Sequence, residues 1–573
     1  MRAFIRARES SLILLAAVAG ALAGVVVAAM SNGVDLLHSL FFGLPLGQRL
    51  SALASLDPVV AVLVPMLGGL ALGVAHIFIA AWRPAREVDP IEANALHGGR
   101  MSFIGSVIVA LQTVWSSGVG ASVGMEAGYT QLASGIASRI GRAFRLRRAD
   151  LRILVGCGAA GGIAGAFGAP LAGAFYGFEL VIGNYSVTSL APVGVASLLG
   201  YLVAGGLATA RLGVVAPQAA AVTNHDLVLA ALLGLVIALF GIALMRGVYL
   251  FEAALDRCKL PAVVRPTVGG IIVGLFAIVT PQVMSSGHGA LRLSGMLDLP
   301  LASIATILVL KALASIVSLG SGFRGGLFFA SLLMGALGGQ LFATAITAID
   351  PALYVDSNAY AVVGMSALSA SVIGAPLTMI FVALESTGNL WLTAAVLIAV
   401  IISAQVTREL FGYSFATWRF HLRGETIRSA ADIGWLRDLT VGRMMRQDVK
   451  TVSSEMTVAA FQEAFPPGST GQVVAVDNNG RYAGLVMVAE AHAAELGENA
   501  FIFEILRHAE DMLLPSMTVQ EAVAAFDRTE SEVLAVVDAP SSRRVLGTLS
   551  EAHALRRYLA ELEQRRREYA GAR

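Results

Sequence analysis

Charged residues are scarce in this chain. Only 14% of its 573 residues are Asp, Glu, Lys or Arg, whereas 56% are hydrophobic, and the mean hydropathy is +0.73. A soluble protein carries about 25% charged residues, so a single soluble globular domain is excluded. The net charge of +1 offers no bulk electrostatic attraction to nucleic acid, and we expect no nucleic-acid partner.

Cysteine is almost absent. The two cysteines, Cys157 and Cys258, lie in or beside apolar stretches, which excludes a disulfide framework and a cysteine-based metal site. The nine histidines show no metal-ligand spacing, and the sequence contains neither a Walker-type loop nor a Ser-His-Asp order. We therefore expect no metal site and no enzymatic activity.

The few charges are unevenly distributed along the chain. Roughly 38 of the 79 lie in residues 424–573, which indicates a membrane body (1–423) followed by a soluble tail (424–573). Within the body, several apolar stretches reach the ~20 residues that span a bilayer. Others are short or broken by Gly and Pro, which a membrane tolerates only where the backbone is buried in protein or lines a wet cavity.

Two segments of the membrane body repeat. Gly-Ala-Pro-Leu at 168–171 recurs at 374–377, an offset of 206 residues, and a Phe and a Glu follow each copy at the same spacing. The glycine-rich turn 124–128 has a partner of like shape at 322–326, an offset of 198. These repeats divide the body into halves of about 1–215 and 225–423. Because each half has an odd or broken set of spans, we predict an inverted repeat with a midplane anion site at helix N-termini.

Basic residues predict the orientation in the membrane. The N-terminus carries arginines before the first apolar run, and residues 139–152 contain six more. By the positive-inside rule both segments face the cytoplasm. Binding of lipid head groups is the alternative for the loop, and a signal peptide is the alternative for the N-terminus. We expect an integral protein of the bacterial inner membrane, with its N-terminus and tail cytoplasmic.

Glu126 is an acid inside an apolar, glycine-flanked turn. A carboxylate is costly to bury in a membrane and is a functional candidate by default, although a structural helix cap is the alternative. When ionised, it would occupy the anion site formed by free N–H groups of a helix start. When protonated, it would leave and admit the substrate anion.

A second glycine-rich helix start lies at 325–329, where the backbone N–H groups of Leu327 and Phe328 would point into the same site. Close helix packing is the alternative interpretation of these glycines. Tyr413 ends the last apolar run, and its hydroxyl would donate to an anion or anchor the chain at the interface. Glu179 and Glu385 recur symmetrically, and we expect them to be structural acids at helix ends.

Taken together, these segments resemble the CLC family of chloride channels and proton-coupled anion exchangers. Five segments occur in the family's order: Gly124–Gln131, Ala159–Gly173, Gly325–Phe328, Ala361–Asn389 and Tyr413. The resemblance implies an all-α polytopic membrane protein with an inverted repeat, a homodimer, and one anion pathway in each subunit. It also implies that the anion is coordinated by the amides of Met125, Glu126, Leu327 and Phe328 and by the hydroxyl of Tyr413.

Three positions depart from the family pattern. Glu87 stands where the family has an inner-gate serine, Leu180 replaces a proton-relay glutamate, and Arg324 replaces a small residue or proline. A carboxylate at Glu87 would repel a halide by a few kcal/mol at an effective dielectric near 20. Arg324, which the sequence repeat aligns with Glu126, would supply a compensating cation. We expect Glu87 and Arg324 to line the pathway, and a larger or protonatable anion remains open.

The tail contains a second repeat, with a period of 61 residues. Residues 474–477 recur as 535–538, and short apolar strands alternate with helical stretches. This pattern resembles a pair of CBS domains, at about 439–500 and 501–573. Such pairs commonly bind adenine nucleotides, and the resemblance makes Thr548 and Ser550 the candidates for this role. We favour a structural dimerisation module, because His553 replaces the usual acidic residue and Met487 stands where a hydroxyl would be useful. Nucleotide binding is the alternative.

We therefore expect CLC-type transport of chloride or a related anion across a lipid bilayer. Glu126 would gate a loosely coupled or uncoupled channel, because Leu180 cannot carry a proton. The alternatives are a proton/anion exchanger and a transporter of a larger organic anion or zwitterion. A sodium-coupled solute transporter and a nucleotide-reading receptor are rivals from other classes, and no cofactor is certain.

Overall fold

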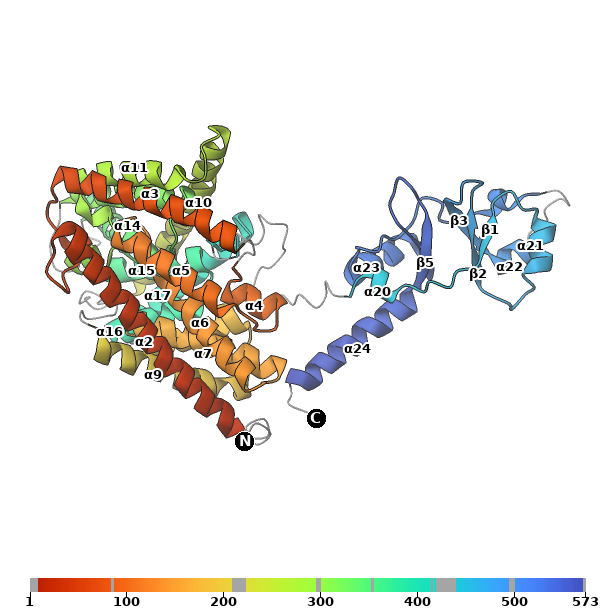
Figure 1. Ribbon diagram of the computed structural model, residues 1–573, viewed down its shortest axis with the longest axis horizontal. Helices are drawn as coiled ribbons and strands as arrows, with labels where there is room; N and C mark the ends of the chain where they lie inside the picture. Colours follow the sequence, from red (N-terminus) through yellow and green to blue (C-terminus); the bar gives the residue numbers. More distant parts are fainter. Residues whose placement is uncertain are drawn as a thin grey trace. The chain divides into compact units, whose positions relative to one another are not determined.

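The computed structural model describes residues 9–83, 87–208, 223–294, 300–351, 355–412, 414, 415, 417, 418, 439–493 and 500–569 (Figure 1). The chain divides into two compact units, Met1–Asp432 and Ile433–Arg573. The first unit is helical and the second is a small α/β unit, so the predicted fold class is confirmed. The boundary that we expected at residue 423 lies outside the described residues.

The first half of the membrane body runs from α2 to α9. Its elements are α2 (Glu9–Phe42), η1 (Leu50–Ala52), α3 (Pro58–Trp82), α4 (Pro90–Leu96), α5 (Phe103–Gly118), α6 (Glu126–Ala143), α7 (Arg148–Phe167), α8 (Pro170–Tyr176), the π-helical turn η2 (Gly177–Ile182) and α9 (Val187–Leu207).

The second half repeats this order from α10 to α17. Its elements are α10 (Asn224–Arg257), α11 (Arg265–Val279), η3 (Pro281–Val283), α12 (His288–Ser294), α13 (Leu301–Gly320), α14 (Phe328–Ile349), α15 (Ser357–Ile373), α16 (Pro376–Thr387) and α17 (Leu390–Leu410). Eight of the helices that the structure describes are long and apolar enough to cross a membrane. Several others have 17 residues or fewer, as the broken apolar stretches predicted.

The repeated Gly-Ala-Pro segments break two apolar stretches at equivalent places. Gly168 ends α7 and Gly374 ends α15 in the left-handed conformation, with φ of 66° and 82°, which glycine adopts without a Cβ clash. Pro170 and Pro376 then occupy the first position of α8 and α16, where a helix needs no N–H donor. Both halves therefore contain the same long helix, break and short helix.

The short helices α8 and α16 cap each other. Glu179, in η2, accepts hydrogen bonds of 2.9 and 2.8 Å from the first backbone N–H groups of α16. Glu385, in α16, accepts bonds of 2.7 and 2.9 Å from the first N–H groups of α8. Between these caps the rings of Phe175 and Phe381 stack with centroids 4.1 Å apart. This two-fold arrangement supports the inverted repeat and confirms that both acids are structural caps.

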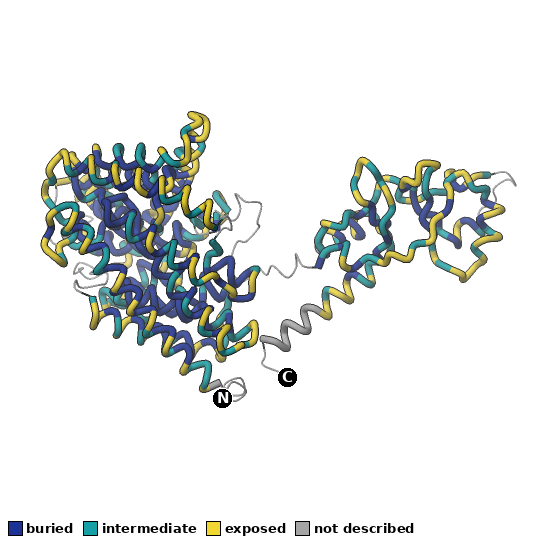
Figure 2. Tube along the Cα trace, in the orientation of Figure 1, coloured by how far each residue is buried: buried dark blue, intermediate teal, exposed yellow. Residues whose placement is uncertain are grey.

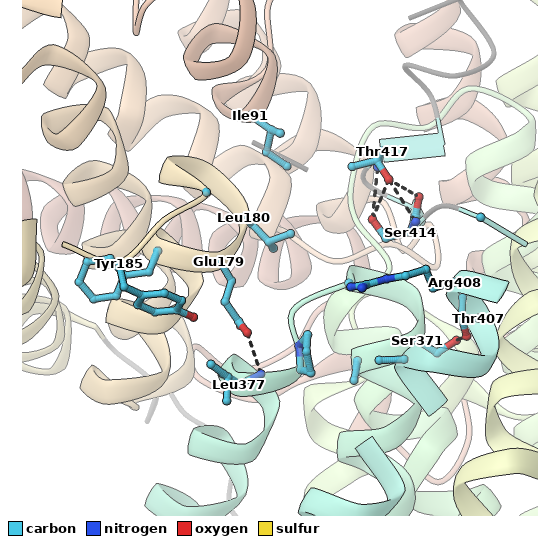
Figure 3. Close-up of a pocket in the computed structure, with 17 residues that line it drawn as sticks. Ile91, Glu179, Leu180, Tyr185, Ser371, Leu377, Thr407, Arg408, Ser414 and Thr417 are labelled. Carbon is cyan, nitrogen blue, oxygen red and sulfur yellow. Dashed lines mark hydrogen bonds between the residues drawn. The ribbon is translucent and has the colours of Figure 1, made fainter. Parts of the chain in front are cut away.

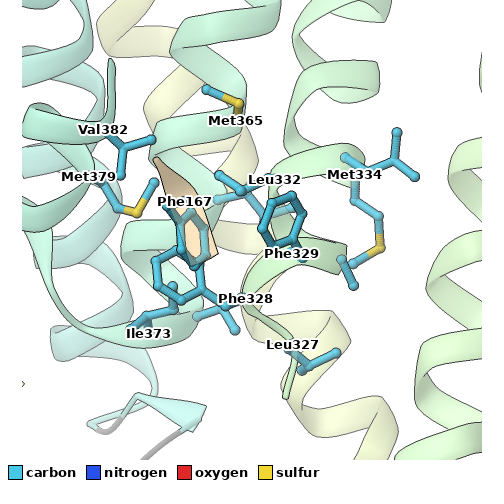
Figure 4. Packing of buried hydrophobic residues seen from close by; sticks show 14 of the residues in the cluster. Phe167, Leu327, Phe328, Phe329, Leu332, Met334, Met365, Ile373, Met379 and Val382 are labelled. Carbon is cyan, nitrogen blue, oxygen red and sulfur yellow. The ribbon is translucent and has the colours of Figure 1, made fainter. Parts of the chain in front are cut away.

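Close packing brings the helix starts to the centre of the body, where buried residues concentrate (Figure 2). Gly335 of α14 and Gly364 of α15 lie against each other's backbone carbonyl, so a Cβ at either position would clash. Phe167, at the end of α7, packs on Phe328 and Phe329 at the start of α14, with ring centroids 4.3 and 4.7 Å apart (Figure 4). These contacts hold the start of α14 in a fixed place.

The C-terminal unit contains the same small α/β motif twice. Its elements are α20 (Val441–Met444), β1 (Thr451–Ser453), α21 (Val458–Ala464), β2 (Gln472–Val476), β3 (Tyr482–Met487), α22 (Val488–Ala493), η4 (Ile502–Ile505), α23 (Val519–Thr529), β4 (Val533–Val537), β5 (Val545–Ser550) and α24 (Glu551–Tyr569). β2 pairs antiparallel with β3 and parallel with β1, and β4 pairs antiparallel with β5. Both α21 and α23, and β2 and β4, start 61 residues apart, which confirms the predicted repeat of elements.

Candidate functional site

The N-termini of α6 and α14 meet at the centre of the membrane body. Gly124 and Gly326 exchange backbone hydrogen bonds of 2.9 and 3.0 Å in an isolated antiparallel bridge. Met125 follows one glycine as the N-cap of α6, and Leu327 follows the other as the N-cap of α14. The structure thus brings together the two helix starts that the sequence predicted for the anion site.

Glu126, the first residue of α6, reaches across this junction. Its side chain is buried, with 4% of the residue exposed. Its Oε1 accepts a hydrogen bond from the backbone N–H of Phe329, in the first turn of α14. Its Oε2 has no hydrogen-bond partner among the residues that the structure describes. The carboxylate therefore sits at a helix N-terminus, where the dipole and free amides favour an anion.

A cavity of about 140 Å³ opens beside the carboxylate. Its lining includes Glu126, Leu327 and Phe328, all three predicted for the site. A water molecule needs roughly 10–15 Å³ of such space, so the cavity has room for a small anion with some of its hydration water. Tyr413 lies outside the described residues, but Phe415, two residues later, lines the cavity.

The cavity has two further polar side chains, Thr130 and Tyr176, that we did not predict from the sequence. Tyr176, in α8, and Thr130, in α6, both line it, and the Thr130 hydroxyl donates to the backbone carbonyl of Glu126 at 2.9 Å. The equivalent of Tyr176 in the second half is the buried Val382. A comparison of the two halves identifies only residues that occur in both, so it could not identify Tyr176 as a site residue.

The acid that faces the cavity from the loop before α4 is Asp89 and not Glu87. Asp89 is the N-cap of α4, accepts a hydrogen bond of 2.8 Å from the N–H of Ile91, and lines the cavity. Glu87 lies 4.0 Å from Arg83 and against Gly105 in α5, away from the cavity lining. The prediction that Glu87 lines the pathway is therefore wrong for this cavity. Because α4 starts at Pro90, its N-cap residue Asp89 lies at the cavity instead.

Arg324 does not line this cavity either. Its side chain is exposed and acts electrostatically on His76 of α3, while its backbone N–H donates to Ser116 Oγ at 3.1 Å. The bridge pairs Gly124 with Gly326, an offset of 202 residues, so the structural counterpart of Glu126 is Phe328. The predicted offset of 198 between the glycine-rich turns, which pairs Arg324 with Glu126, is therefore wrong.

A basic side chain near the site, Lys311 in α13, was not predicted. Lys311 is fully buried, with 0% exposed, and its Nζ donates to the carbonyl oxygens of Val283 and Ser285 at 3.0 and 2.8 Å. Its ammonium and the Glu126 carboxylate act on each other electrostatically. A signal was present, because Lys311 is the one charged residue in the apolar sequence of α13.

A second, larger cavity of about 570 Å³ adjoins the first at Ile91, which lines both (Figure 3). It lies between η2, α15, α17 and the segment after α17. Leu180 lines it, and Glu179 points from it toward the start of α16 (Figure 3). The guanidinium of Arg408 belongs to its wall. The pair of cavities thus extends from Glu126 to an exposed arginine.

The tail residues proposed for a nucleotide lie in β5. The backbone of Thr548 exchanges hydrogen bonds with that of Arg446, and Ser550 Oγ accepts a bond of 3.3 Å from the N–H of His553, in α24. Burial lowers the pKa of His553, as do the nearby Arg446, Arg556 and Arg557. Ser550 is therefore a helix cap within a basic surrounding.

The chain is similar to known anion-transport proteins. Residues 77–408 match the family model described as "Voltage gated chloride channel". A putative chloride channel protein, ClcB-like, from Ralstonia nicotianae is 33% identical over 332 residues, which cover 57% of this chain and 77% of that protein. The voltage-gated ClC-type chloride channel ClcB of Escherichia coli is 29% identical over 407 residues, covering 70% and 96%.

Among solved structures, a slow cyanobacterial Cl⁻/H⁺ antiporter superposes with a TM-score of 0.63. It is 20% identical, and the match covers 72% of this chain and 97% of the antiporter. At this identity the likeness shows a shared fold.

Proposed function

Because this chain belongs to the voltage-gated chloride channel family, we propose that it moves chloride or a related anion across a membrane and that Glu126 is the gate. One observation carries the gate assignment. The Glu126 carboxylate accepts the amide hydrogen of Phe329 at the start of α14, which is a place that also suits a small anion.

The gate works by competition for that place. While it is ionised, Glu126 fills the positive end of the α14 dipole and excludes other anions. Protonation removes its negative charge, so the amides hold it less strongly than they hold a halide. The carboxyl then leaves, and the anion coordinates the amides of Leu327, Phe328 and Phe329 across from those of Met125 and Glu126.

The larger cavity would be the cytoplasmic entrance. The arginine-rich segment 139–152 joins α6 to α7, and Asn94 of α4 donates to the carbonyl of Arg152 at 3.0 Å. By the positive-inside rule, α4 and both adjoining cavities then open to the cytoplasm. Arg408 would concentrate anions at that entrance.

Conduction is proposed to be uncoupled from protons or only loosely coupled to them. Leu180, which stands where the resemblance implies a proton-relay glutamate, cannot bind a proton. Its neighbour Glu179 has both carboxylate oxygens engaged in the cap of α16. Proton/anion exchange is the second candidate, because Asp89 adds a protonatable group to the cavity of Glu126.

The size of the cavity favours a small anion over a larger organic one. Pockets for drug-sized molecules enclose about 300–1,000 Å³, whereas the cavity beside Glu126 has about 140 Å³. Chloride or a related inorganic anion is therefore the substrate class that we propose.

Two further proposals concern assembly and the tail. The exposed apolar side chains of α9 and α17, such as Leu190 and Trp391, suit a homodimer interface within the bilayer. The tail is proposed to be a CBS pair that contributes to this dimer. Adenine nucleotide binding near Thr548 and Ser550 is the alternative role.

Anion efflux from proteoliposomes, recorded together with internal pH, tests the gate. Glu126→Gln mimics the protonated acid, so we expect its flux to be independent of pH and unaccompanied by proton movement. Glu87→Gln is the matched control, because it makes the same chemical change in an acid outside the cavity lining. A Glu126→Gln protein with wild-type pH dependence would refute the gate, and chloride-driven proton uptake by the wild type would establish exchange instead.

A further inference from the structure

Lys311 is a basic side chain buried in a membrane-spanning helix. It lies in α13 among apolar residues, and no part of it is exposed. A buried ammonium is costly unless an opposite charge compensates for it. Its two hydrogen bonds go to backbone carbonyls, which satisfy N–H donors but supply no net negative charge. The negative charge must come from elsewhere.

Lys311 and Glu126 approach the same helix start from two sides. The Lys311 ammonium donates to the carbonyl of Ser285, and the adjacent Ser286 hydrogen-bonds His288. His288 stacks on Phe329, whose N–H donates to the Glu126 carboxylate. In the described part of the chain, Glu126 is the carboxylate that acts electrostatically on Lys311.

Among the described residues, His288 also interacts electrostatically with Lys311, as it does with Arg49 and Arg292. Its ring stacks on Phe329. A histidine is either neutral or cationic, so it supplies no negative charge. The tyrosines around Glu126, Tyr129 and Tyr176, carry no charge at neutral pH. Among the residues that the structure describes, the negative counterpart of Lys311 is therefore the proposed gate itself.

We propose that Lys311 is the fixed countercharge of the anion site, pairing with the Glu126 carboxylate when the gate is closed and with the transported anion when Glu126 is protonated. This inference rests on the proposed function of Glu126. Protonation of the gate would otherwise leave Lys311 as an uncompensated buried cation. Binding of a halide restores neutrality, so anion entry and gate protonation support each other.

A neutral residue at position 311 should change the pH at which Glu126 is protonated. A neighbouring ammonium stabilises the ionised carboxylate and lowers its affinity for protons. Removing the ammonium makes Glu126 hold its proton at higher pH. Anion flux through a neutral Lys311 variant should then reach half its maximum at a pH about one unit higher, which corresponds to a tenfold change in proton affinity.

The same substitution should also weaken anion binding. At acidic pH, where the gate is open in every variant, the anion concentration for half-maximal flux should rise about tenfold, since the ion has lost its countercharge. A purely structural lysine predicts neither change. It predicts only a lower yield or a lower melting temperature.

Three variants and one matched control test the proposal in proteoliposomes. Lys311→Arg keeps the charge, Lys311→Met removes it, and Lys311→Gln removes it while keeping N–H donors for the carbonyls of Val283 and Ser285. The control is Ser117→Ala, because Ser117 Oγ hydrogen-bonds Ser285 Oγ at 2.8 Å. This control loosens the same segment without changing charge.

We expect both neutral variants to show the higher midpoint pH and the weaker anion dependence, while Lys311→Arg and Ser117→Ala stay near wild type. If Lys311→Met fails to assemble, Lys311→Gln and Lys311→Arg give the same contrast. A Lys311→Gln protein with a wild-type midpoint and wild-type anion dependence overturns the inference. Glu126→Gln in the same assay separates the two claims. If the flux of Glu126→Gln keeps its pH dependence, Glu126 is not the gate. If that pH dependence is lost while Lys311→Gln keeps the wild-type midpoint pH, Glu126 is the gate but Lys311 is not its countercharge.

Discussion

The side chains around the proposed anion site carry charges of both signs. Glu126 and Asp89 line the same cavity, the first at the start of α6 and the second at the start of α4. Lys311 lies near the first, and the hydroxyls of Tyr176 and Thr130 lie at the wall. A cavity with two acids admits an anion readily only when their negative charge is neutralised or displaced.

Asp89→Asn should increase anion flux at neutral pH by about fivefold to thirtyfold. A charge a few ångströms from the pathway opposes an anion by roughly 1–2 kcal/mol at the effective dielectric of a partly hydrated site. Asparagine also caps helices about as well as aspartate, so α4 should remain intact. Initial rates of chloride efflux at fixed voltage measure the effect.

Glu87→Gln serves as the control for this prediction as well, since it removes an acid two residues away that faces Arg83. Its flux should equal that of the wild type. Equal rates for both variants, or a slower Asp89→Asn protein, would mean that Asp89 acts only as a cap.

At the scale of elements, the sequence predicts the helix breaks correctly, whereas the short glycine-rich turns taken alone give the wrong register between the halves. Gly168 and Gly374 recur with a following proline, and this chemistry forces a helix to end and another to begin. The glycine-rich turns mislead when residues 124–128 and 322–326 are compared alone, because an offset of 198 pairs two glycines there. Over a longer stretch, an offset of 202 pairs Gly118, Gly120 and Gly124 with glycines at 320, 322 and 326. The backbone bridge between Gly124 and Gly326 has this offset, and it pairs Glu126 with Phe328.

Residues outside any repeat were the hardest to find. Lys311 and Tyr176 have no equivalent residue in the other half, so a comparison of the halves does not identify them. Asp89 lies two residues after Glu87, and which of the two acids reaches the cavity depends on where α4 starts. Their importance comes from long-range packing, which brings α4, α8 and α13 toward the start of α6. Glu126 was identifiable because an acid in an apolar turn is unusual in itself.

The reciprocal caps of α8 and α16 predict matched effects on stability. Glu179→Ala and Glu385→Ala each remove two hydrogen bonds to a helix N-terminus, and each should lower the free energy of unfolding by about 1–2 kcal/mol. Thermal unfolding in detergent should show a lower melting temperature for both variants. The pH dependence of anion flux should be retained, since neither acid lines the cavity of Glu126; a flat pH profile in Glu179→Ala would instead assign that residue to the gate.

At the scale of the whole molecule, the two halves of the membrane body build one site that neither could build alone. Each half supplies one glycine-rich helix start, and the first half adds Glu126, the acid that we propose competes with the anion. The inverted arrangement directs both helix starts at the same place. The tail is a separate compact unit with its own repeat, so the gate assignment does not depend on it.

The most direct measurement locates the anion itself. Crystals of wild-type protein and of Glu126→Gln, grown in bromide and measured at the bromine absorption edge, would show where the ion binds. We expect an anomalous peak within hydrogen-bonding distance of the Phe329 amide in Glu126→Gln, and none there in the wild type, where the carboxylate occupies that position. A bromide bound beside the Phe329 amide while the Glu126 carboxylate stays on it, or a Glu126→Gln protein with bromide only elsewhere, would contradict the claim that the acid and the anion compete for one site.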